Sequence, residues 1–277
     1  MGFYAYFREL EKITEALDMD VHFPSYPTVK GYINEEYNSL GLQAYIPKIR
    51  TSTAQMEDLT IEMNNELDAL DLSVYVFNRL PKENPTAAKI GDVKAHMNLT
   101  ARENELDMTI SLDNTDSIRN AGEIQVGALL QQYNNKPHAN IHIQPTEIVL
   151  NDSIWTINES DIIYTVAEKK MDIRSFSINT DFQRIAADGI ASTDPNDSIE
   201  VELQNIDLQY LLGYTEASKA ISVQGPLSGW AKIYGLFAQP MIEANALLPN
   251  AGLNGTYLGD VTATAYLDRE AKAIIIN

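Results

Sequence analysis

The chain has 277 residues, and 20 lysines and arginines against 39 aspartates and glutamates give it a formal charge of −19 at pH 7. This length allows one or two domains with a sizeable core, and a hydrophobic content of 44% is too high for a disordered chain. The acidic balance argues against a nucleic-acid partner, because phosphate groups repel such a surface. The lack of cysteine excludes disulfides, cysteine–zinc sites and thiol catalysis. No apolar run reaches the ~18 residues that indicate a membrane span, and we expect no signal peptide at the start of this sequence.

Residues 3–19 predict an amphipathic helix. Phe7, Leu10, Ile13 and Leu17 recur every three or four residues, which places them on one face of a helix. A second, short helix is predicted near residues 207–214, where an aspartate that could cap it precedes clustered leucines.

Most of the remaining chain alternates apolar and polar residues with a period of two. This alternation is typical of strands that have one apolar and one polar face. In the clearest run, Met108, Ile110 and Leu112 alternate with Thr109 and Ser111. The residues predicted on the apolar faces are Leu72, Val74, Val76, Leu106, Met108, Ile110, Leu112, Ile141, Ile143, Ile148, Leu150, Phe176, Ile178, Ile199, Val201, Leu203, Val261, Ala263, Ala265 and Leu267.

Short polar segments separate these runs, and they have the composition of turns. Strands joined by such turns are antiparallel, because parallel neighbours need crossovers of a dozen or more residues. The sequence therefore predicts a mostly β, antiparallel fold in one continuous unit over residues 1–277, since no Pro-rich or Gly/Ser-rich linker divides the chain. The turn segments are residues 64–65, 103–104, 134–135, 194–197, 249–252 and 254–255.

No motif indicates a catalytic or metal site. His138 and His142 share one face of a strand, but four strand residues span about 13 Å, too far to share a metal ion. His22 and His96 are isolated in the sequence. We therefore assign no metal or catalytic role to any of the four histidines. Nucleophile elbows, phosphate loops and dinucleotide fingerprints do not occur. We therefore expect a protein that is not an enzyme and that needs no cofactor.

The C-terminal third contains a pattern that resembles the TamB (translocation and assembly module) family of the AsmA-like superfamily. It consists of Gly225-Pro-Leu-Ser-Gly229, a proline at 240, and Leu253-Asn-Gly-Thr-Tyr-Leu-Gly-Asp-Val261. The middle of the chain, with Pro145-Thr-Glu-Ile-Val-Leu-Asn-Asp-Ser-Ile-Trp155, resembles members from Bacteroidota, and the resemblance covers roughly residues 90–277. Asp-Ser-Ile also occurs at 116–118, 152–154 and 197–199, where a turn before a strand is the simpler interpretation and a Bacteroidota-type O-glycosylation tripeptide the alternative.

The resemblance implies antiparallel strands stacked into an elongated U-shaped groove with an apolar lining. It implies a periplasmic protein, anchored in the inner membrane outside this segment, that conducts phospholipid or another acyl-chain lipid between the inner and outer membranes. The chain would then be an interior piece of a longer protein.

Two alternatives to the lipid-conducting groove remain open from the sequence. The segment could serve as a scaffold for outer-membrane β-barrel assembly, pairing its strand edges with a barrel partner. It could instead be a closed β-sandwich that binds glycan or protein. Alternation alone does not distinguish these from a groove, because it shows that one face is apolar but not what covers that face.

Overall fold

The computed structural model is mostly β, as the sequence predicts. It describes residues 1–8, 10–16, 19–51, 55–66, 68–79, 92–114, 118–133, 136–208, 222–268 and 273–276. Every strand pairing given for these ranges is antiparallel, which confirms the prediction from the short turns. None of the helices within them is long and apolar enough to cross a membrane. The chain divides into two compact units, Met1–Gly127 with Ile148–Asp152 (unit 1) and Ala128–Glu147 with Ser153–Asn277 (unit 2).

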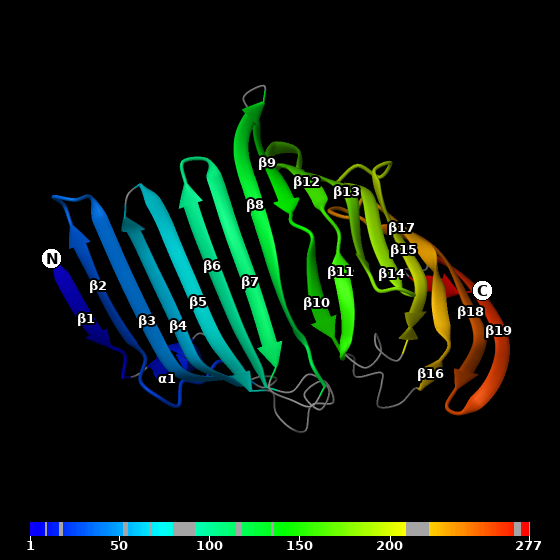
Figure 1. Ribbon diagram of the computed structural model, residues 1–277, viewed down its shortest axis with the longest axis horizontal. Helices are drawn as coiled ribbons and strands as arrows, with labels where there is room; N and C mark the ends of the chain where they lie inside the picture. The colour runs from blue at the N-terminus through cyan, green and yellow to red at the C-terminus, as the bar shows by residue number, and fades with distance from the viewer. Residues whose placement is uncertain are drawn as a thin grey trace. The chain divides into compact units, whose positions relative to one another are not determined.

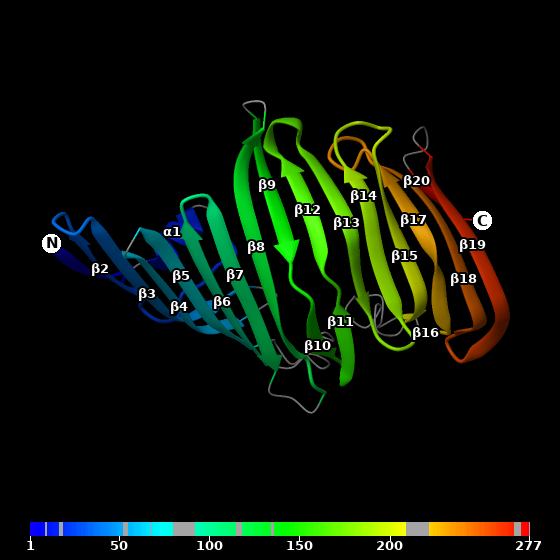
Figure 2. The ribbon, with the colours of Figure 1, turned by 45° about the horizontal axis from the view of Figure 1, so that its top comes forward.

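Unit 1 is a meander in which the first seven strands pair in chain order (Figures 1 and 2). Four of the six connections between these strands have only two to four residues, which returns each strand directly beside the one before it, whereas the longer segments 7–27 and 80–92 join the other two pairs. A further pairing joins β10 to the start of β8. Its elements are β1 (Gly2–Tyr6), α1 (Leu10–Ala16), β2 (Thr28–Asn34), β3 (Ser39–Arg50), β4 (Gln55–Glu66), β5 (Ala69–Arg79), β6 (Val93–Arg102), β7 (Glu105–Asn114), the first part of β8 (Ala121–Tyr133) and most of β10 (Thr146–Leu150).

Unit 2 pairs its strands in the order β9, β12, β13, β14, β15, β17, β18, β19 and β20. The short strands β11 and β16 pair with β13 and β18. Its elements are β9 (Lys136–Ile143), β11 (Ser153–Ile157), β12 (Ser160–Thr165), η1 (Val166–Glu168), β13 (Lys170–Asn179), β14 (Arg184–Ala191), β15 (Ser198–Asp207), β16 (Val223–Gln224), β17 (Pro226–Tyr234), β18 (Met241–Leu253), β19 (Thr256–Asp268) and β20 (Ala273–Ile276).

The prediction of one helix over residues 3–19 is wrong at its start. Residues 2–6 form β1, whose residues pair one by one with β2, from Gly2 opposite Tyr32 to Tyr6 opposite Thr28. The alternation of Phe3 and Ala5 with tyrosines suits a strand, and the free edge of β2 supplies the hydrogen bonds that favour this conformation. Of the predicted helix, α1 covers residues 10–16, and residues 9, 17 and 18 lie outside the described residues. Of the predicted second helix, Asp207 ends β15, and residues 209–214 lie outside the described residues.

Several predicted turns are confirmed, and two are wrong. Asp194 and Asp197 close a turn with a backbone hydrogen bond of 3.2 Å, and Asn254 and Gly255 take positive φ between β18 and β19. Residues 64–65 lie instead inside β4, where they pair in continuous register with β5. Residues 249–252 lie inside β18, where register shifts on either side of Ala251 absorb the extra residues. Residues 134–135 lie outside the described ones. The Asp-Ser-Ile segments at 152–154 and 197–199 lead from turns into β11 and β15, as the simpler interpretation requires; of the third, only Ile118 is described.

Candidate functional site

The most extensive chemical feature of unit 1 is a continuous apolar face. Side chains of directly paired residues in antiparallel strands lie on the same side of the sheet, so the register determines which residues are neighbours. Two rows of paired residues cross all seven strands without a charged or polar side chain. They are Ala5–Val29–Ala44–Ile61–Val74–Met97–Ile110 and Phe3–Gly31–Leu42–Met63–Leu72–Leu99–Met108. We call this surface the unit 1 apolar face.

The opposite side of the same strands is polar. The row adjacent to Ile110 contains Ser73, Asn98 and Thr109. On the same side, Thr100 donates a hydrogen bond of 2.7 Å to Asp71. The two faces therefore differ in chemistry across the full set of strands, as the alternation predicts.

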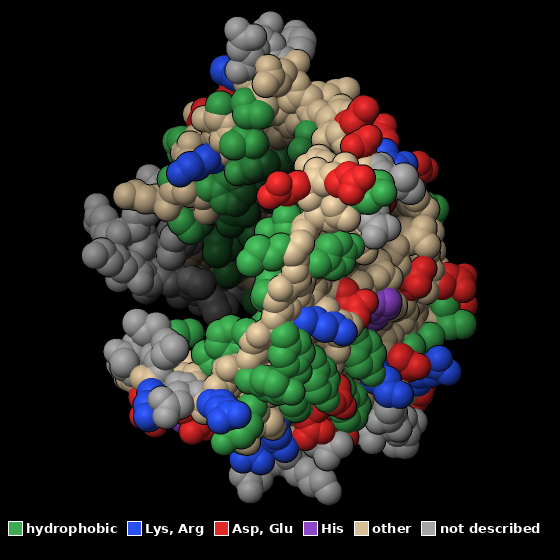
Figure 3. Space-filling view, turned by 90° about the vertical axis from the view of Figure 1, so that its left-hand side faces the viewer, with side chains coloured by type: hydrophobic (Ala, Val, Ile, Leu, Met, Phe, Trp, Pro, Cys, Tyr) green, Lys and Arg blue, Asp and Glu red, His purple; other side chains and the backbone are tan. Residues whose placement is uncertain are grey.

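The unit 1 apolar face is not covered by a second layer of the described residues. In a closed sandwich, inward-facing side chains at mid-strand are fully buried. Here Ile110 is 39% exposed and Leu112 is 40% exposed. The other large members of the two rows are half-buried, apart from the exposed Phe3. In Figure 3, which views the end of the molecule where β1 lies, hydrophobic side chains gather along a hollow.

Unit 2 has an apolar face of the same kind. A row of isoleucines crosses it with one glycine among them, and the adjacent rows carry mostly small residues, including Ala187, Ala231 and Ala244. Ile199 is 6% exposed, whereas most other members are half-buried. The isoleucine row is Ile141–Ile162–Ile173–Gly189–Ile199–Ile233–Ile242.

The structure places the predicted lining residues on these faces in two separate sets. The unit 1 set contains Leu72, Val74, Val76, Leu106, Met108, Ile110 and Leu112, which the register of β5, β6 and β7 brings together. The unit 2 set contains Ile141, Phe176, Ile178, Ile199, Val201, Leu203, Val261, Ala263 and Ala265 in paired rows, with Ile143 opposite Ser160. Ile148 pairs with Gly122 of β8, and Leu150 ends β10. Leu267 lies in β19, and its side chain is outside the described part.

Ten of the fourteen residues in the two rows of the unit 1 apolar face were not predicted from the sequence. Val29, Leu42, Ile61 and Met97 lie in its rows but were not predicted. Alanines and glycines interrupt the apolar series in β2 and β3, which weakens the alternation there. The structure shows why one of the glycines is present. A Cβ on Gly31 would approach the ring of Phe3 to 2.7 Å, so the glycine leaves room for that ring.

A cavity of about 940 Å³ lies in unit 1 at the turn ends of β2 to β6. Asn65, Leu70 and Ala101 line it and form a row of paired residues parallel to the Met63–Leu72–Leu99 row. These three residues border the end of the unit 1 apolar face, whereas Tyr32 and Asn34 lie on the opposite side of the sheet, because they alternate with Gly31 on β2. Its other lining residues are Tyr32, Asn34, Tyr37, Asn38, Ser39, Asp68 and Ala69. A smaller cavity of about 440 Å³ shares Tyr32 with it.

The polar face of unit 2 carries ion pairs between neighbouring strands. Lys232 lies 3.1 Å from Glu200, and this carboxylate raises the pKa of Lys232 above its usual value. The same ammonium lies 5.9 Å from the ring centre of Trp230, which is 39% exposed on this face. Trp155 in β11 is 8% exposed and belongs to the core of the unit. The exposed pairs hold adjacent strands in register and add little free energy each.

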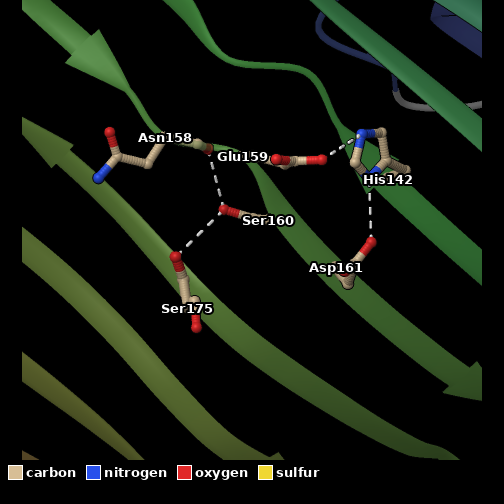
Figure 4. A network of polar contacts seen from close by, with 6 residues as sticks. All are labelled: His142, Asn158, Glu159, Ser160, Asp161 and Ser175. Carbon is tan, nitrogen blue, oxygen red and sulfur yellow. Dashed lines mark hydrogen bonds and ion pairs between the residues drawn. The ribbon is translucent and has the colours of Figure 1, made fainter.

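His142 lies in a polar network of unit 2 that Figure 4 shows. Its Nδ1 is 2.9 Å from Asp161 and its Nε2 is 3.4 Å from Glu159. The hydroxyl of Ser160 donates to the backbone carbonyls of Asn158 and Ser175, at 3.1 and 3.4 Å. The imidazole of His142 links β9 to Asp161 of β12, and the hydroxyl of Ser160 links β12 to Ser175 of β13. Together these contacts connect the three strands. No group of three or more His, Asp or Glu side chains that could hold a metal ion occurs among the described residues.

Comparisons with protein-family models, with curated proteins and with solved structures find no match for this chain.

Proposed function

We propose that this chain is a segment of a lipid-conducting protein and that the unit 1 apolar face holds the acyl chains of phospholipids. The observation that carries the proposal is the pair of uninterrupted apolar rows across seven strands, whose side chains remain half-exposed. A soluble protein rarely leaves so large an apolar surface uncovered unless that surface binds something. The TamB-like motifs support the same interpretation, and with them a periplasmic location for the protein.

The dimensions of the face suit an acyl chain. Adjacent strands lie ~4.8 Å apart, so a row across seven strands extends about 30 Å. The hydrocarbon core of a bilayer is about 30 Å thick and contains two leaflets, so one extended acyl chain requires about 15 Å. One row is therefore long enough for a complete chain.

The energetics explain why a lipid carrier needs such a face. A phospholipid has on the order of 30 methylenes, so exposing its tails to water costs about 25 kcal/mol at ~0.8 kcal/mol per group. A continuous apolar surface removes much of this cost without any reactive residue. Methionines in the rows, such as Met63, Met97 and Met108, add side chains that adapt to chains of different shape.

Organic extraction of the purified protein, followed by mass spectrometry, tests the proposal. We expect phospholipid to be recovered in a fixed ratio to protein after detergent-free purification. Recovery of no acyl-chain lipid, combined with failure to bind added lipid, would contradict the proposal.

A second candidate function is supported by the edge of unit 1. Among the described residues, β1 pairs with β2 alone, and it carries the exposed aromatic residues Phe3, Tyr4 and Tyr6. An unpaired edge of this kind can accept a strand from a partner, and an outer-membrane β-barrel precursor would supply one. Photocrosslinking from position 4 to a barrel protein in cells would favour this scaffold function.

A further inference from the structure

The polar side of unit 1 carries a row of tyrosines on the face opposite the one proposed to hold lipid. Directly paired residues share one side of the sheet, so the register that defines the apolar rows also defines this row. Tyr6, Tyr45 and Tyr75 lie on β1, β3 and β5, and they are 60%, 38% and 37% exposed. Threonines of β2 and β4 lie between them, so large and small side chains alternate along the row. We call it the tyrosine row, and it is Tyr6–Thr28–Tyr45–Thr60–Tyr75–His96.

Neighbouring side chains contact each of the three tyrosines. The rings of Tyr4 and Tyr6 meet edge to face, with their centres 4.8 Å apart. The hydroxyl of Tyr45 donates a hydrogen bond of 2.8 Å to Asp58. The ring of Tyr75 meets the imidazole at the end of the row edge to face, with their centres 6.4 Å apart. These contacts fix an edge or the hydroxyl of each tyrosine and leave part of the side chain exposed to a ligand.

We propose that the tyrosine row binds a basic, proline-rich segment of a partner protein in the polyproline II conformation. Neighbouring strands lie ~4.8 Å apart, so alternate strands lie ~9.6 Å apart. One turn of polyproline II has three residues and rises ~9.3 Å, which matches this spacing. Prolines three residues apart would therefore lie over Thr28 and Thr60, each between two tyrosines. Surfaces lined with aromatic side chains are the usual binding sites for such segments.

The charges on this side of the sheet favour a basic segment. Glu62 in the next row, and Asp71 and Asp107 in the row after it, supply three carboxylates. Among the described residues of those two rows, Lys30 is the one lysine or arginine. Asp58, which accepts the hydrogen bond from Tyr45, adds a further carboxylate beside the tyrosine row. A segment with lysines between its prolines would be attracted to this surface, and an acidic segment would be repelled.

Calorimetric titration of the full chain with a synthetic peptide of three Pro-Pro-Lys repeats tests the proposal. A peptide of three Gly-Gly-Lys repeats has the same charge without the polyproline II conformation. A peptide of three Pro-Pro-Glu repeats keeps the conformation and reverses the charge. We expect the Pro-Pro-Lys peptide to bind at least about tenfold more tightly than either control peptide. Its binding should weaken as the ionic strength rises, because the charges involved are exposed.

Substitutions in the tyrosine row provide the second part of the test. Tyr45→Ala removes the ring that both proposed proline positions share, so it should weaken binding at least about tenfold, whereas Tyr45→Phe should keep it within about twofold. Tyr6→Ala removes a largely exposed ring, so it tests the row even if Tyr45→Ala disturbs the fold, and it should weaken binding at least about threefold. Tyr37→Ala, in the turn between β2 and β3, is the matched control and should bind as the wild type does. Circular dichroism shows whether each variant retains its strands.

Three results would overturn the proposal. The first is failure of the wild type to bind the Pro-Pro-Lys peptide, or equal binding of all three peptides. The second is unchanged binding in both Tyr6→Ala and Tyr45→Ala. The third is binding of a β-linked oligosaccharide in place of the peptide, which would identify the row as a glycan surface, because tyrosine rings also stack on sugars. Ile110→Asp lies on the opposite face and should leave peptide binding unchanged, so this test is independent of the proposed lipid binding.

Discussion

A charge placed on the unit 1 apolar face is the sharpest test of lipid binding there. Ile110 lies at mid-strand in β7, between Met108 and Leu112 on the same face, and Thr109 lies on the opposite face. Ile110→Asp puts a carboxylate where the acyl chain is proposed to lie. Thr109→Asp places the same group one residue away on the polar face and serves as the matched control.

The expected magnitude follows from the exposure of Ile110. Complete burial of an isoleucine side chain stabilises by about 1.5–3 kcal/mol, and Ile110 remains 39% exposed. Covering it with an acyl chain should therefore contribute about 1 kcal/mol. Ile110→Asp loses this contribution and adds the cost of an unpaired carboxylate against hydrocarbon, at least ~1 kcal/mol more. Together these predict a loss of lipid affinity of at least about 20-fold.

The assay measures binding of dioctanoyl phosphatidylcholine by titration calorimetry, with circular dichroism to show that the strands are retained. Photocrosslinking residues at positions 110 and 109 provide an independent readout. We expect position 110 to capture lipid and position 109 to capture none. Equal capture at both positions, or equal loss of affinity in the two aspartate variants, would refute the argument that one face of β7 holds the lipid.

Three further predictions concern stability and ionisation. Gly189→Ala should destabilise unit 2 by about 1–3 kcal/mol in chemical denaturation, because Gly189 has a φ of +117° and an added Cβ would meet the backbone of β15. Trp155→Ala should cost about 3–5 kcal/mol, whereas Trp230→Ala should cost distinctly less because that ring is 39% exposed; equal costs would contradict the burial assigned to Trp155. Lys136 lies 2.6 Å from Glu168 and lowers the pKa of that carboxyl group. The stabilising effect of this ion pair is therefore present above the usual glutamate pKa, and it is lost as the pH falls through the lowered pKa of Glu168. Lys136→Met should raise the pKa of Glu168 toward the usual value in an NMR titration, and an unchanged pKa would refute this pairing.

Local sequence determined the class of fold and the smaller part of the candidate site. Alternation around Ile110 was sufficient to separate the apolar from the polar side of β7, because residues on a strand point to opposite faces by geometry alone. The turn residues then required antiparallel neighbours. Where the alternation was diluted by small residues, as around Gly31 and Gly41, the same reasoning found no lining residue.

Pairing and packing between strands decided the conformation of residues 2–6, the continuity of the apolar face and the position of the cavity. Residues 2–6 became a strand because β2 offers an edge that satisfies their backbone groups, and the residues with helical spacing begin only after them, at Phe7. The continuity of the apolar face depends on register between strands, since a shift of one residue would place polar side chains in its rows. The openness of that face, and the cavity that residues from two hairpins line together, depend on which segments pack together. No local pattern encodes that packing, because residues far apart in the chain make these contacts only after the strands have paired.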